Sequence, residues 1–325
     1  MILKKGDEIR VIAPSRSMNI LTKEQVEVAK KRLEDEGFKV TFGKHVYESI
    51  EYYNCAPVDA RLEDLHDAFK DKNVKCIIAA LGGYNVNQLL EKIDYDLIKN
   101  NPKIICGFSD ITALLNAIYT KTGMTTFLGP IFSNFGMEKG FEYTLDYFNK
   151  VLCSDDEVEI TSSPYYSDDK WYKDQENRNF IKNDGMKVIN EGKCSGTIIG
   201  GNLCTLNLLQ GTEFMPSLKD RVLFIEDDNE TGENFLVEFD RNLESLMQLE
   251  DFKYVKGIVF GIAQLESNMT DEKWELMIKL KEKLKDIPII INANFGHTTP
   301  IFTFPIGGSC TIDALRDNLK IIIRK

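Results

Sequence analysis

A serine in a sharp strand-to-helix turn is the first feature of this sequence that could do chemistry. The run Ile104 to Cys106 is short and apolar, which is typical of a buried strand, and it breaks at Gly107. Apolar positions recur at helical spacing from Ile111, so we expect Ser109 on the turn. Such a turn presents a hydroxyl to a cleft and aims helix N-terminal N–H groups at the group it attacks. Ser109 is therefore a candidate nucleophile; the alternative is that Ser109 or Asp110 only caps the helix.

A nucleophilic serine needs a base, and the chain has only three histidines. His45 follows a strand pattern in a polar loop, and His66 falls on the polar side of an amphipathic helix, so both are interpreted as surface residues. His297 follows Gly296 just beyond an apolar strand, where parallel sheets build their sites. His297 is the candidate base, although a lone loop histidine is often structural.

The base needs a carboxylate to orient it, and the best candidate ends an apolar strand. Glu226 follows Val222 to Ile225, where a carboxylate is costly to desolvate without a partner such as His297. Asp227 and Asp228 follow directly, so the alternative is a solvated acidic turn. Spacing alone does not separate the three acids. The chain order serine, acid, histidine is permitted, because such triads recur in several orders.

Two glycine pairs follow strands and precede helix patterns. The segment Gly82 to Asn85 matches a backbone donor for an oxyanion, because glycine lets a substrate carbonyl approach the N–H closely. A phosphate loop is the weaker interpretation, since neither G-x-G-x-x-G nor a Walker A sequence is present. The segment Gly200 to Asn202 is a similar turn, interpreted either as a plain tight turn or as a contact to ligand.

Trp171 lies in an irregular stretch with Tyr165, Tyr166 and Tyr172 nearby. An exposed loop tryptophan can stack on a planar ligand. It can equally cover the small core of its own loop, and the sequence leaves both interpretations open.

The elements that must position these residues alternate between strand and helix in the first half of the chain. Short apolar strands are expected over the following ranges: Ile9 to Ala13, Lys39 to Phe42, Cys76 to Leu81, Ile104 to Cys106 and Thr125 to Leu128. Helical patterns lie between them, which predicts a parallel sheet with right-handed crossovers. Ligands bind at the carboxyl ends of such strands, so one cleft could collect Pro14-Ser15, the Gly82 turn and Ser109.

The second half restarts the same pattern after a polar, aromatic middle without clear periodicity. We expect strands over Gly196 to Ile199, Val222 to Ile225, Gly257 to Phe260 and Ile289 to Ile291, with helices between them. The predicted organisation is a domain carrying the nucleophile over residues 1–165, a linker and loop region over 166–190, and a domain carrying the acid and the histidine over 191–325.

Composition excludes several classes of function. The formal net charge of -11 and pI of about 5.0 disfavour binding to nucleic acid or to an anionic membrane. No stretch approaches the roughly 20 apolar residues of a membrane span, and the first residues lack a signal-peptide core, so we expect a cytoplasmic protein. The seven cysteines are scattered and odd in number, which predicts reduced thiols rather than disulfides or a zinc site.

Five motifs occur together in one order along the chain. They are Gly82-Gly83-Tyr84-Asn85, Gly107-Phe108-Ser109-Asp110-Ile111-Thr112, Ile199-Gly200-Gly201-Asn202-Leu203, Phe224-Ile225-Glu226-Asp227 and Asn294-Phe295-Gly296-His297-Thr298. In this set the chain resembles the serine peptidase family of the LD-carboxypeptidases and the microcin C immunity peptidases. The middle stretch around Trp171 is more similar to the microcin-immunity branch. One departure is Leu81, where many LD-carboxypeptidases have arginine before the glycine pair.

The resemblance implies a fold and a catalytic set. The fold would be α/β, with an N-terminal flavodoxin-like parallel-sheet domain and a C-terminal swivelling α/β domain around one active site. Ser109 would be the nucleophile, His297 the general base and then acid, and Glu226 the orienting carboxylate. The backbone N–H groups of Gly83 and Asp110 would form the oxyanion hole.

The resemblance also implies how substrate is held. Substrate contacts are expected from Tyr84, Asn85, Trp171, Gly201 and Asn202, with Trp171 stacking on the nucleotide of an immunity-type substrate. Members of the family are commonly homodimers and need no metal, so no cofactor is expected.

Two functions remain in view. The first is a serine carboxypeptidase-type hydrolase that cleaves an LD-peptide, or a peptidyl- or aminoacyl-nucleotide such as microcin C, through an acyl-enzyme. The second is a two-domain protein that binds or senses a small ligand without turnover. They differ in whether the hydroxyl, imidazole and carboxylate reach hydrogen-bond distance.

Overall fold

The N-terminal part of the chain builds a six-stranded sheet in the order β14-β5-β4-β3-β1-β2. The computed structural model describes all 325 residues. Five strands of this sheet are parallel and follow the 2-1-3-4-5 order of a flavodoxin-like fold. They are β1 (Glu8–Ile12), β2 (Lys39–Phe42), β3 (Val74–Ala79), β4 (Ile104–Gly107) and β5 (Thr126–Leu128). These pairings confirm the predicted parallel sheet. Its strands are apolar on both faces, so helices must cover each face.

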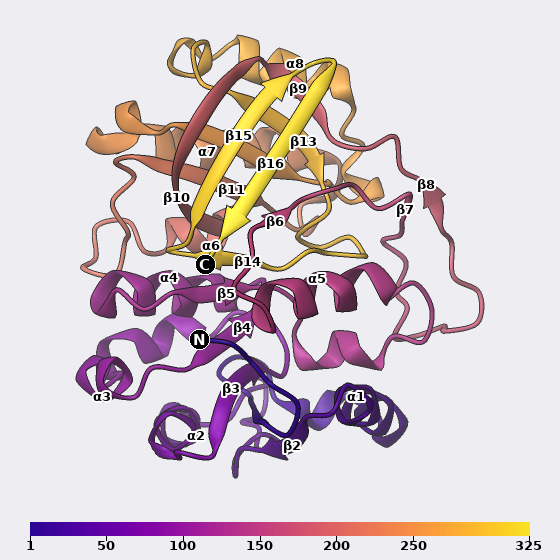
Figure 1. Ribbon diagram of the computed structural model, residues 1–325, viewed down its shortest axis with the longest axis vertical. Helices are drawn as coiled ribbons and strands as arrows, with labels where there is room; N and C mark the ends of the chain where they lie inside the picture. Colours follow the sequence, from indigo (N-terminus) through magenta and orange to yellow (C-terminus); the bar gives the residue numbers. More distant parts are fainter.

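Helices cover both faces of this sheet. They are α1 (Lys23–Asp35), α2 (Val58–Lys70), α3 (Tyr95–Asn100), α4 (Ile111–Thr122) and α5 (Glu142–Leu152), with shorter 3₁₀ segments η1 (Met18–Ile20), η2 (Val86–Lys92) and η3 (Phe132–Gly136). The helix α4 lies at the junction of the two halves (Figure 1), where its Asn116 side chain donates to the Gly200 carbonyl at 2.8 Å. It therefore contacts the second sheet as well as the first, and the turn that carries Ser109 precedes it directly.

The second half forms an eight-stranded mixed sheet, in the order β6-β16-β15-β10-β11-β12-β13-β9. Its parallel centre is β10 (Gly192–Asn202), β11 (Arg221–Glu226), β12 (Gly257–Gly261) and β13 (Ile289–Ala293), as the apolar runs predicted. The antiparallel strands are β6 (Val158–Glu159), β9 (Lys187–Asn190), β15 (Ser309–Leu315) and β16 (Asn318–Arg324). The helices are α6 (Leu203–Asn207), α7 (Phe235–Met247) and α8 (Asp271–Lys279), with 3₁₀ segments η4 (Gly232–Asn234), η5 (Glu250–Tyr254), η6 (Leu265–Ser267) and η7 (Glu282–Leu284).

Each sheet is completed by a strand from the other half of the chain. The strand β14 (Phe304–Ile306) follows β13 in sequence but pairs antiparallel with β5 of the first sheet. In return β6, which follows α5, pairs with β16 of the second sheet. Figure 1 shows β14 and the C-terminus at the level where the two halves meet. The chain thus crosses between the halves more than once, beyond the single linker that the sequence predicted.

The middle stretch is more structured than the sequence indicated. Besides β6 and β9 it contains a small two-stranded sheet, β7 (Tyr165–Tyr166) and β8 (Ile181–Lys182). Ser167 then forms an isolated antiparallel bridge with Thr299, their backbone N–H and carbonyl groups pairing at 2.7 Å in both directions. We call residues 167–172 the strap. This bridge fixes the strap beside the loop that carries His297.

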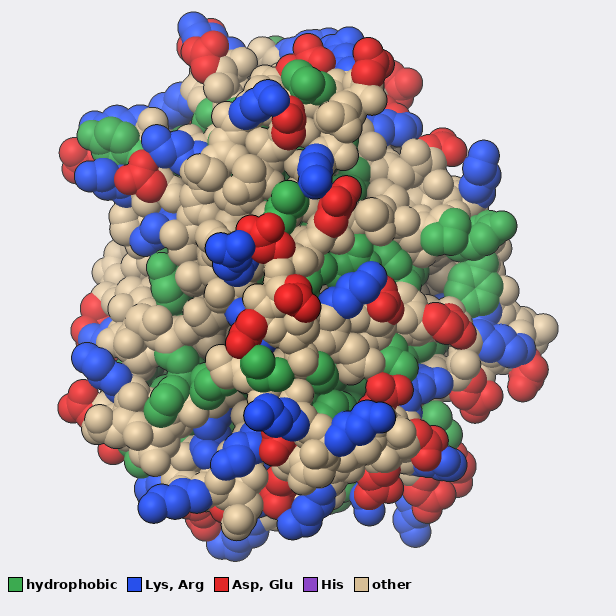
Figure 2. All heavy atoms as spheres, viewed as in Figure 1, with side chains coloured by type: hydrophobic (Ala, Val, Ile, Leu, Met, Phe, Trp, Pro, Cys, Tyr) green, Lys and Arg blue, Asp and Glu red, His purple; other side chains and the backbone are tan.

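One cluster of 89 buried apolar residues extends through both halves, so the two sheets share a continuous core. Acidic and basic side chains are interspersed over the face in Figure 2, without a broad region of one sign. None of the helices combines the length and the apolar character that crossing a membrane would require.

Candidate active site

Ser109 lies on the predicted turn, in a strained backbone conformation. The four residues of β4 are buried, and α4 begins at Ile111, two residues after the serine. Ser109 has a φ of 62°, in the left-handed region that a non-glycine residue seldom adopts. Strand and helix approach so closely here that a Cβ on Gly107 would lie 2.9 Å from the Ile111 side chain. The sharp turn lifts the hydroxyl out of the sheet, as the strand-to-helix turn of the α/β-hydrolases does for their nucleophilic serine.

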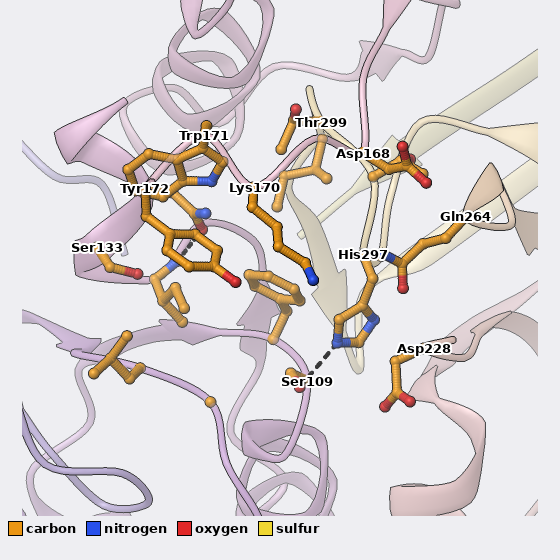
Figure 3. Close-up of a pocket in the computed structure, with 18 of the residues that line it drawn as sticks. Ser109, Ser133, Asp168, Lys170, Trp171, Tyr172, Asp228, Gln264, His297 and Thr299 are labelled. Atoms are coloured by element: carbon orange, nitrogen blue, oxygen red, sulfur yellow. Dashed lines mark hydrogen bonds between the residues drawn. The ribbon is translucent and has the colours of Figure 1, made fainter. Parts of the chain in front are cut away.

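His297 joins this serine to a buried carboxylate. Its Nε2 lies 3.0 Å from Ser109 Oγ, and its Nδ1 lies 2.7 Å from Glu226 Oε2 (Figure 3 shows the first contact). A carboxylate only accepts, so Nδ1 carries a proton that it donates to Glu226. The acid in contact with the imidazole is therefore Glu226, at the end of β11, and not Asp227 or Asp228.

Gly296 makes room for the carboxylate that holds the imidazole. It has a φ of 100°, and a Cβ there would lie 2.4 Å from Glu226 Oε2. Any larger residue would displace the acid from His297. On its other side the imidazole packs edge-on against Phe108, with ring centroids 5.4 Å apart. Imidazole and carboxylate are thus fixed by packing as well as by their hydrogen bond.

The charge on Glu226 controls the protonation of His297. Burial alone would lower the pKa of this histidine, but attraction to Glu226 and the hydrogen bond that the imidazole donates to it, helped by Asp228 and Asp227, raise the pKa to about 9. The carboxylate therefore stabilises an imidazolium. That is the state the histidine must reach after taking a proton from a serine hydroxyl.

Two backbone N–H groups beside Ser109 are left without partners in the chain. The backbone N–H of Gly83 and that of Asp110 donate to no backbone or side-chain acceptor, and both residues lie outside the helices and strands. The glycine pair runs directly over the serine, because a Cβ on Gly82 would lie 2.9 Å from Ser109 Cβ. Donors free to bind a ligand, next to a candidate nucleophile, are what an oxyanion hole requires.

Two cavities flank Ser109, and both are lined in part by Gly83, Tyr84 and Asp228. The larger holds about 570 Å³ and extends from Ser109 and His297 to the strap. The smaller holds about 280 Å³ and extends toward α6 and α7. Ser109 itself lines both cavities. We call them the strap cavity and the α7 cavity.

Trp171 and Tyr172 line the strap cavity in different ways. Trp171 is only 8% exposed and packs edge-on against Tyr172. It is therefore not the exposed loop tryptophan that one interpretation of the sequence expected. Tyr172 is 51% exposed, and Figure 3 shows its hydroxyl directed into the cavity. The fold thus gives the more accessible ring to Tyr172, while the Trp171 indole forms part of the wall.

Other lining residues had no signal in the sequence. Lys170 extends from the strap toward the space between Tyr172 and His297, while Asp228 and Gln264 lie on the far side of the imidazole (Figure 3). Long polar side chains in irregular segments follow no periodic pattern. Only the tertiary contacts of the strap decide where they point.

Three expected substrate contacts lie outside both cavities. Asn85 turns its side chain to the Tyr53 carbonyl at 3.1 Å. Gly201 packs against α4, since a Cβ there would lie 2.5 Å from Thr112 Oγ1. The Asn202 side chain caps α6 and donates to Asp227 at 3.0 Å. The Gly200 turn therefore joins the two halves instead of lining the site.

The other two histidines lie away from this site. His45 is 9% exposed and sits between Glu48, at 2.6 Å, and Glu63, at 3.1 Å, so it is not the surface residue that we expected. The His66 Nε2 accepts a hydrogen bond from the Asp94 backbone at 3.0 Å. Neither contacts a serine hydroxyl.

Comparison with known proteins agrees with this fold. Residues 9–129 match the model of the LD-carboxypeptidase N-terminal domain, and residues 195–312 match that of the LD-carboxypeptidase C-terminal domain. The chain therefore belongs to the LD-carboxypeptidase family of peptidases, which confirms the resemblance drawn from the motifs.

Relatives within the family cover the whole chain. YocD of Bacillus subtilis, whose name assigns it provisionally to the carboxypeptidases, is 51% identical over 99% of this chain and 98% of its own. The crystal structure of an MccF-like protein from Bacillus anthracis has a TM-score of 0.99 and 56% identity, covering 100% of this chain and 98% of that one. The microcin C7 self-immunity protein MccF of Escherichia coli is 30% identical over 98% of this chain and 94% of its own.

MccF has also been solved with a ligand. The structure of MccF in complex with glutamyl sulfamoyl guanosine has a TM-score of 0.89 and 30% identity, and covers 100% of this chain and 97% of that one. A further structure holds aspartyl sulfamoyl adenosine. MccF thus accommodates an aminoacyl group joined to a nucleoside.

Proposed function

We propose that this peptidase is of the serine type and cleaves an amide bond through an acyl-enzyme. The observation that carries the proposal is the continuous path from Ser109 Oγ to His297 at 3.0 Å and on to Glu226 at 2.7 Å. A serine, an imidazole and a buried carboxylate in this order form the arrangement that activates a hydroxyl for attack on a carbonyl. A protein that only binds a ligand has no need of it.

Each residue has a role in the proposed reaction. As Ser109 Oγ attacks the substrate carbonyl, its proton passes to His297 Nε2, and the developing oxyanion accepts hydrogen bonds from the Gly83 and Asp110 N–H groups. His297 then gives the proton to the leaving nitrogen, which departs and leaves an ester on Ser109. Water, activated by the same imidazole, hydrolyses the ester. Glu226 holds the ring in orientation throughout.

The two cavities suggest the form of the substrate. We assign the acyl group to the α7 cavity and the leaving group to the larger strap cavity. Tyr172, Trp171 and Lys170 line the strap cavity, which fits a bulky, planar or anionic leaving group. The aminoacyl nucleosides bound by MccF combine these features, so we favour a peptidyl- or aminoacyl-nucleotide over an LD-linked muropeptide.

Active-site labelling tests the mechanism. A fluorophosphonate should label the wild-type protein at Ser109, as located by peptide mapping, and Ser109→Ala should remove both the label and hydrolysis. Activity is assayed on an LD-tetrapeptide and on an aminoacyl-sulfamoyl adenylate, which compares the two substrate classes. Hydrolysis by Ser109→Ala at the wild-type rate would refute the mechanism. Stoichiometric binding without labelling or turnover would instead favour the sensor.

The reaction as proposed uses no metal. Cys204, Asp227 and Asp228 do place potential ligand atoms within 4.8 Å of one another, beside the α7 cavity. Burial, followed by the charges of Glu226 and Asp228, raises the pKa of Asp227 to about 7. We expect a chelator to leave hydrolysis unchanged. A homodimer, which the resemblance implies, stays a prediction that light scattering would test.

A further inference from the structure

The side chain of Asp110 points away from the reacting atoms and into the loop beside them. Asp110 is 3% exposed, and its Oδ2 accepts hydrogen bonds from the backbone N–H of Asn85 at 2.8 Å and of Val86 at 2.9 Å. The same oxygen accepts from the hydroxyl of the fully buried Ser15. One carboxylate oxygen therefore joins the segments that follow three neighbouring strands, β1, β3 and β4.

A buried arginine holds the other side of the same loop. Arg61, on α2, is 2% exposed, and its Nη1 donates to the carbonyls of Asn85 and Pro14, both at 2.9 Å. The rest of the guanidinium donates to the Ala56 carbonyl at 2.9 Å and to Gln88 Oε1 at 2.6 Å. All of these acceptors are neutral, which is an uncommon environment for a buried charge.

The backbone of Asn85 is thus held from both sides. Its N–H donates to the Asp110 carboxylate, and its carbonyl accepts from Arg61. Charge-assisted bonds of this kind are stronger than neutral ones. Because they fix Asn85, two residues after Gly83, they restrict where the Gly83 N–H can lie relative to Ser109.

We infer that the Asp110 carboxylate and Arg61 are positioning residues that hold the Gly83 N–H in place as an oxyanion donor over Ser109. Asp110 would then have two separate roles, since its own N–H is the second donor. The inference rests on the proposed function, because a preorganised donor matters only where an oxyanion develops. Misplacing such a donor slows the chemical step while leaving substrate binding largely intact.

Substitutions at Asp110 and Ser15 test this inference. We expect Asp110→Ala to lower kcat about 100-fold, close to the loss of one oxyanion donor, with KM within about twofold of wild type. Asp110→Asn keeps an acceptor oxygen at the same distance from the backbone, so its kcat should be about tenfold higher than that of Asp110→Ala. Ser15→Ala removes one donor to the carboxylate at a residue that lines neither cavity, and should lower kcat about tenfold. Ser15→Ala also provides the test if Asp110→Ala fails to fold.

Asp94→Ala is the matched control. Asp94 also accepts a backbone hydrogen bond, from Leu97 at 2.8 Å, but it caps α3 away from the cavities. It should lower thermal stability without changing kcat. The inference is overturned if Asp110→Ala and Ser15→Ala keep kcat within twofold, or if only KM changes. In that case wild-type labelling at Ser109 would show that the proposed function survives; loss of wild-type labelling and turnover would remove both.

Discussion

His297 Nε2 lies 3.0 Å from Ser109 Oγ, although the two residues are 188 positions apart in the sequence. The serine belongs to a turn of the first sheet, and the histidine follows β13 of the second. The loop that carries the histidine is paired through Thr299 with Ser167 of the strap. The distance between the hydroxyl and the imidazole therefore depends on contacts between segments far apart in the chain, and four predictions follow from the groups around it.

The pH dependence of hydrolysis should report the charge of His297. Only a neutral imidazole accepts the serine proton, and its pKa is raised to about 9 despite burial, because Glu226 stabilises the charged form. We expect kcat/KM to rise with pH and to level off above about 9. Glu226→Gln should move this rise to lower pH and reduce the plateau on the order of 10³-fold or more. The exposed Glu275→Gln is the control, and an unchanged profile in Glu226→Gln would contradict the assignment.

Gly83→Ala should damage activity more than a glycine substitution elsewhere. Gly83 has a φ of 151°, and a Cβ there would lie 2.5 Å from Ser15 Oγ and 3.2 Å from the Arg16 nitrogen. We expect a loss of at least about tenfold in kcat, since the shifted loop carries the oxyanion donor. Gly211→Ala, at a φ of 77° in open space, is the control for backbone strain alone. Similar kcat values for the two variants would argue against Gly83 as a donor.

Lys170 should favour leaving groups that carry a negative charge. Its ammonium extends into the strap cavity (Figure 3), while the neighbouring acids are engaged elsewhere: Asp169 pairs with Arg178 at 2.7 Å, and Asp168 accepts from the Leu265 N–H at 2.6 Å. We expect Lys170→Met to raise KM about tenfold for a substrate with a carboxylate or phosphate on the leaving group. The corresponding neutral amide or nucleoside should be unaffected. Lys173→Met, which changes a lysine next to the strap outside the cavity, is the control, and equal losses on both substrates would contradict this role.

The acyl side should disfavour negative charge. Asp228, Glu230 and Glu238 line the α7 cavity, with no lysine or arginine among its residues. A cleft of one sign raises the local concentration of ligands of the opposite sign. We expect higher kcat/KM for a lysyl than for a glutamyl acyl group on the same leaving group. Glu238 lines only the α7 cavity, so Glu238→Lys should reverse this order and Glu238→Gln should weaken it. An unchanged order in both variants would locate the acyl group elsewhere.

The sequence predicted the first sheet well because its signals are local. Each parallel strand is an apolar run, and the turns at Gly82 and Gly107 are marked by glycine. The second sheet was predicted only at its parallel centre. β6 and β9 are short and only partly apolar, and they become strands through pairing with β16 and β13, which no local pattern reports. The same holds for the swap of β14 into the first sheet.

The candidate site shows the same division. Ser109 and His297 could be located because each follows a strand at the edge where sites form. The choice of Glu226 over Asp227 and Asp228 needed the fold, since adjacent residues differ only in direction. Arg61 gave no sequence signal as part of the site, because it lies on an ordinary amphipathic helix and reaches the Asn85 carbonyl only through tertiary packing.

The exchange of β6 and β14 between the sheets means that neither half is a complete folding unit. A cut in the middle of the chain would leave β6 on the fragment with the first sheet and β14 on the fragment with the second. Each sheet, expressed separately, would then lack one of its edge strands. The placement of the Ser109 hydroxyl beside the His297 imidazole therefore depends on an uncut chain, in which both sheets can form.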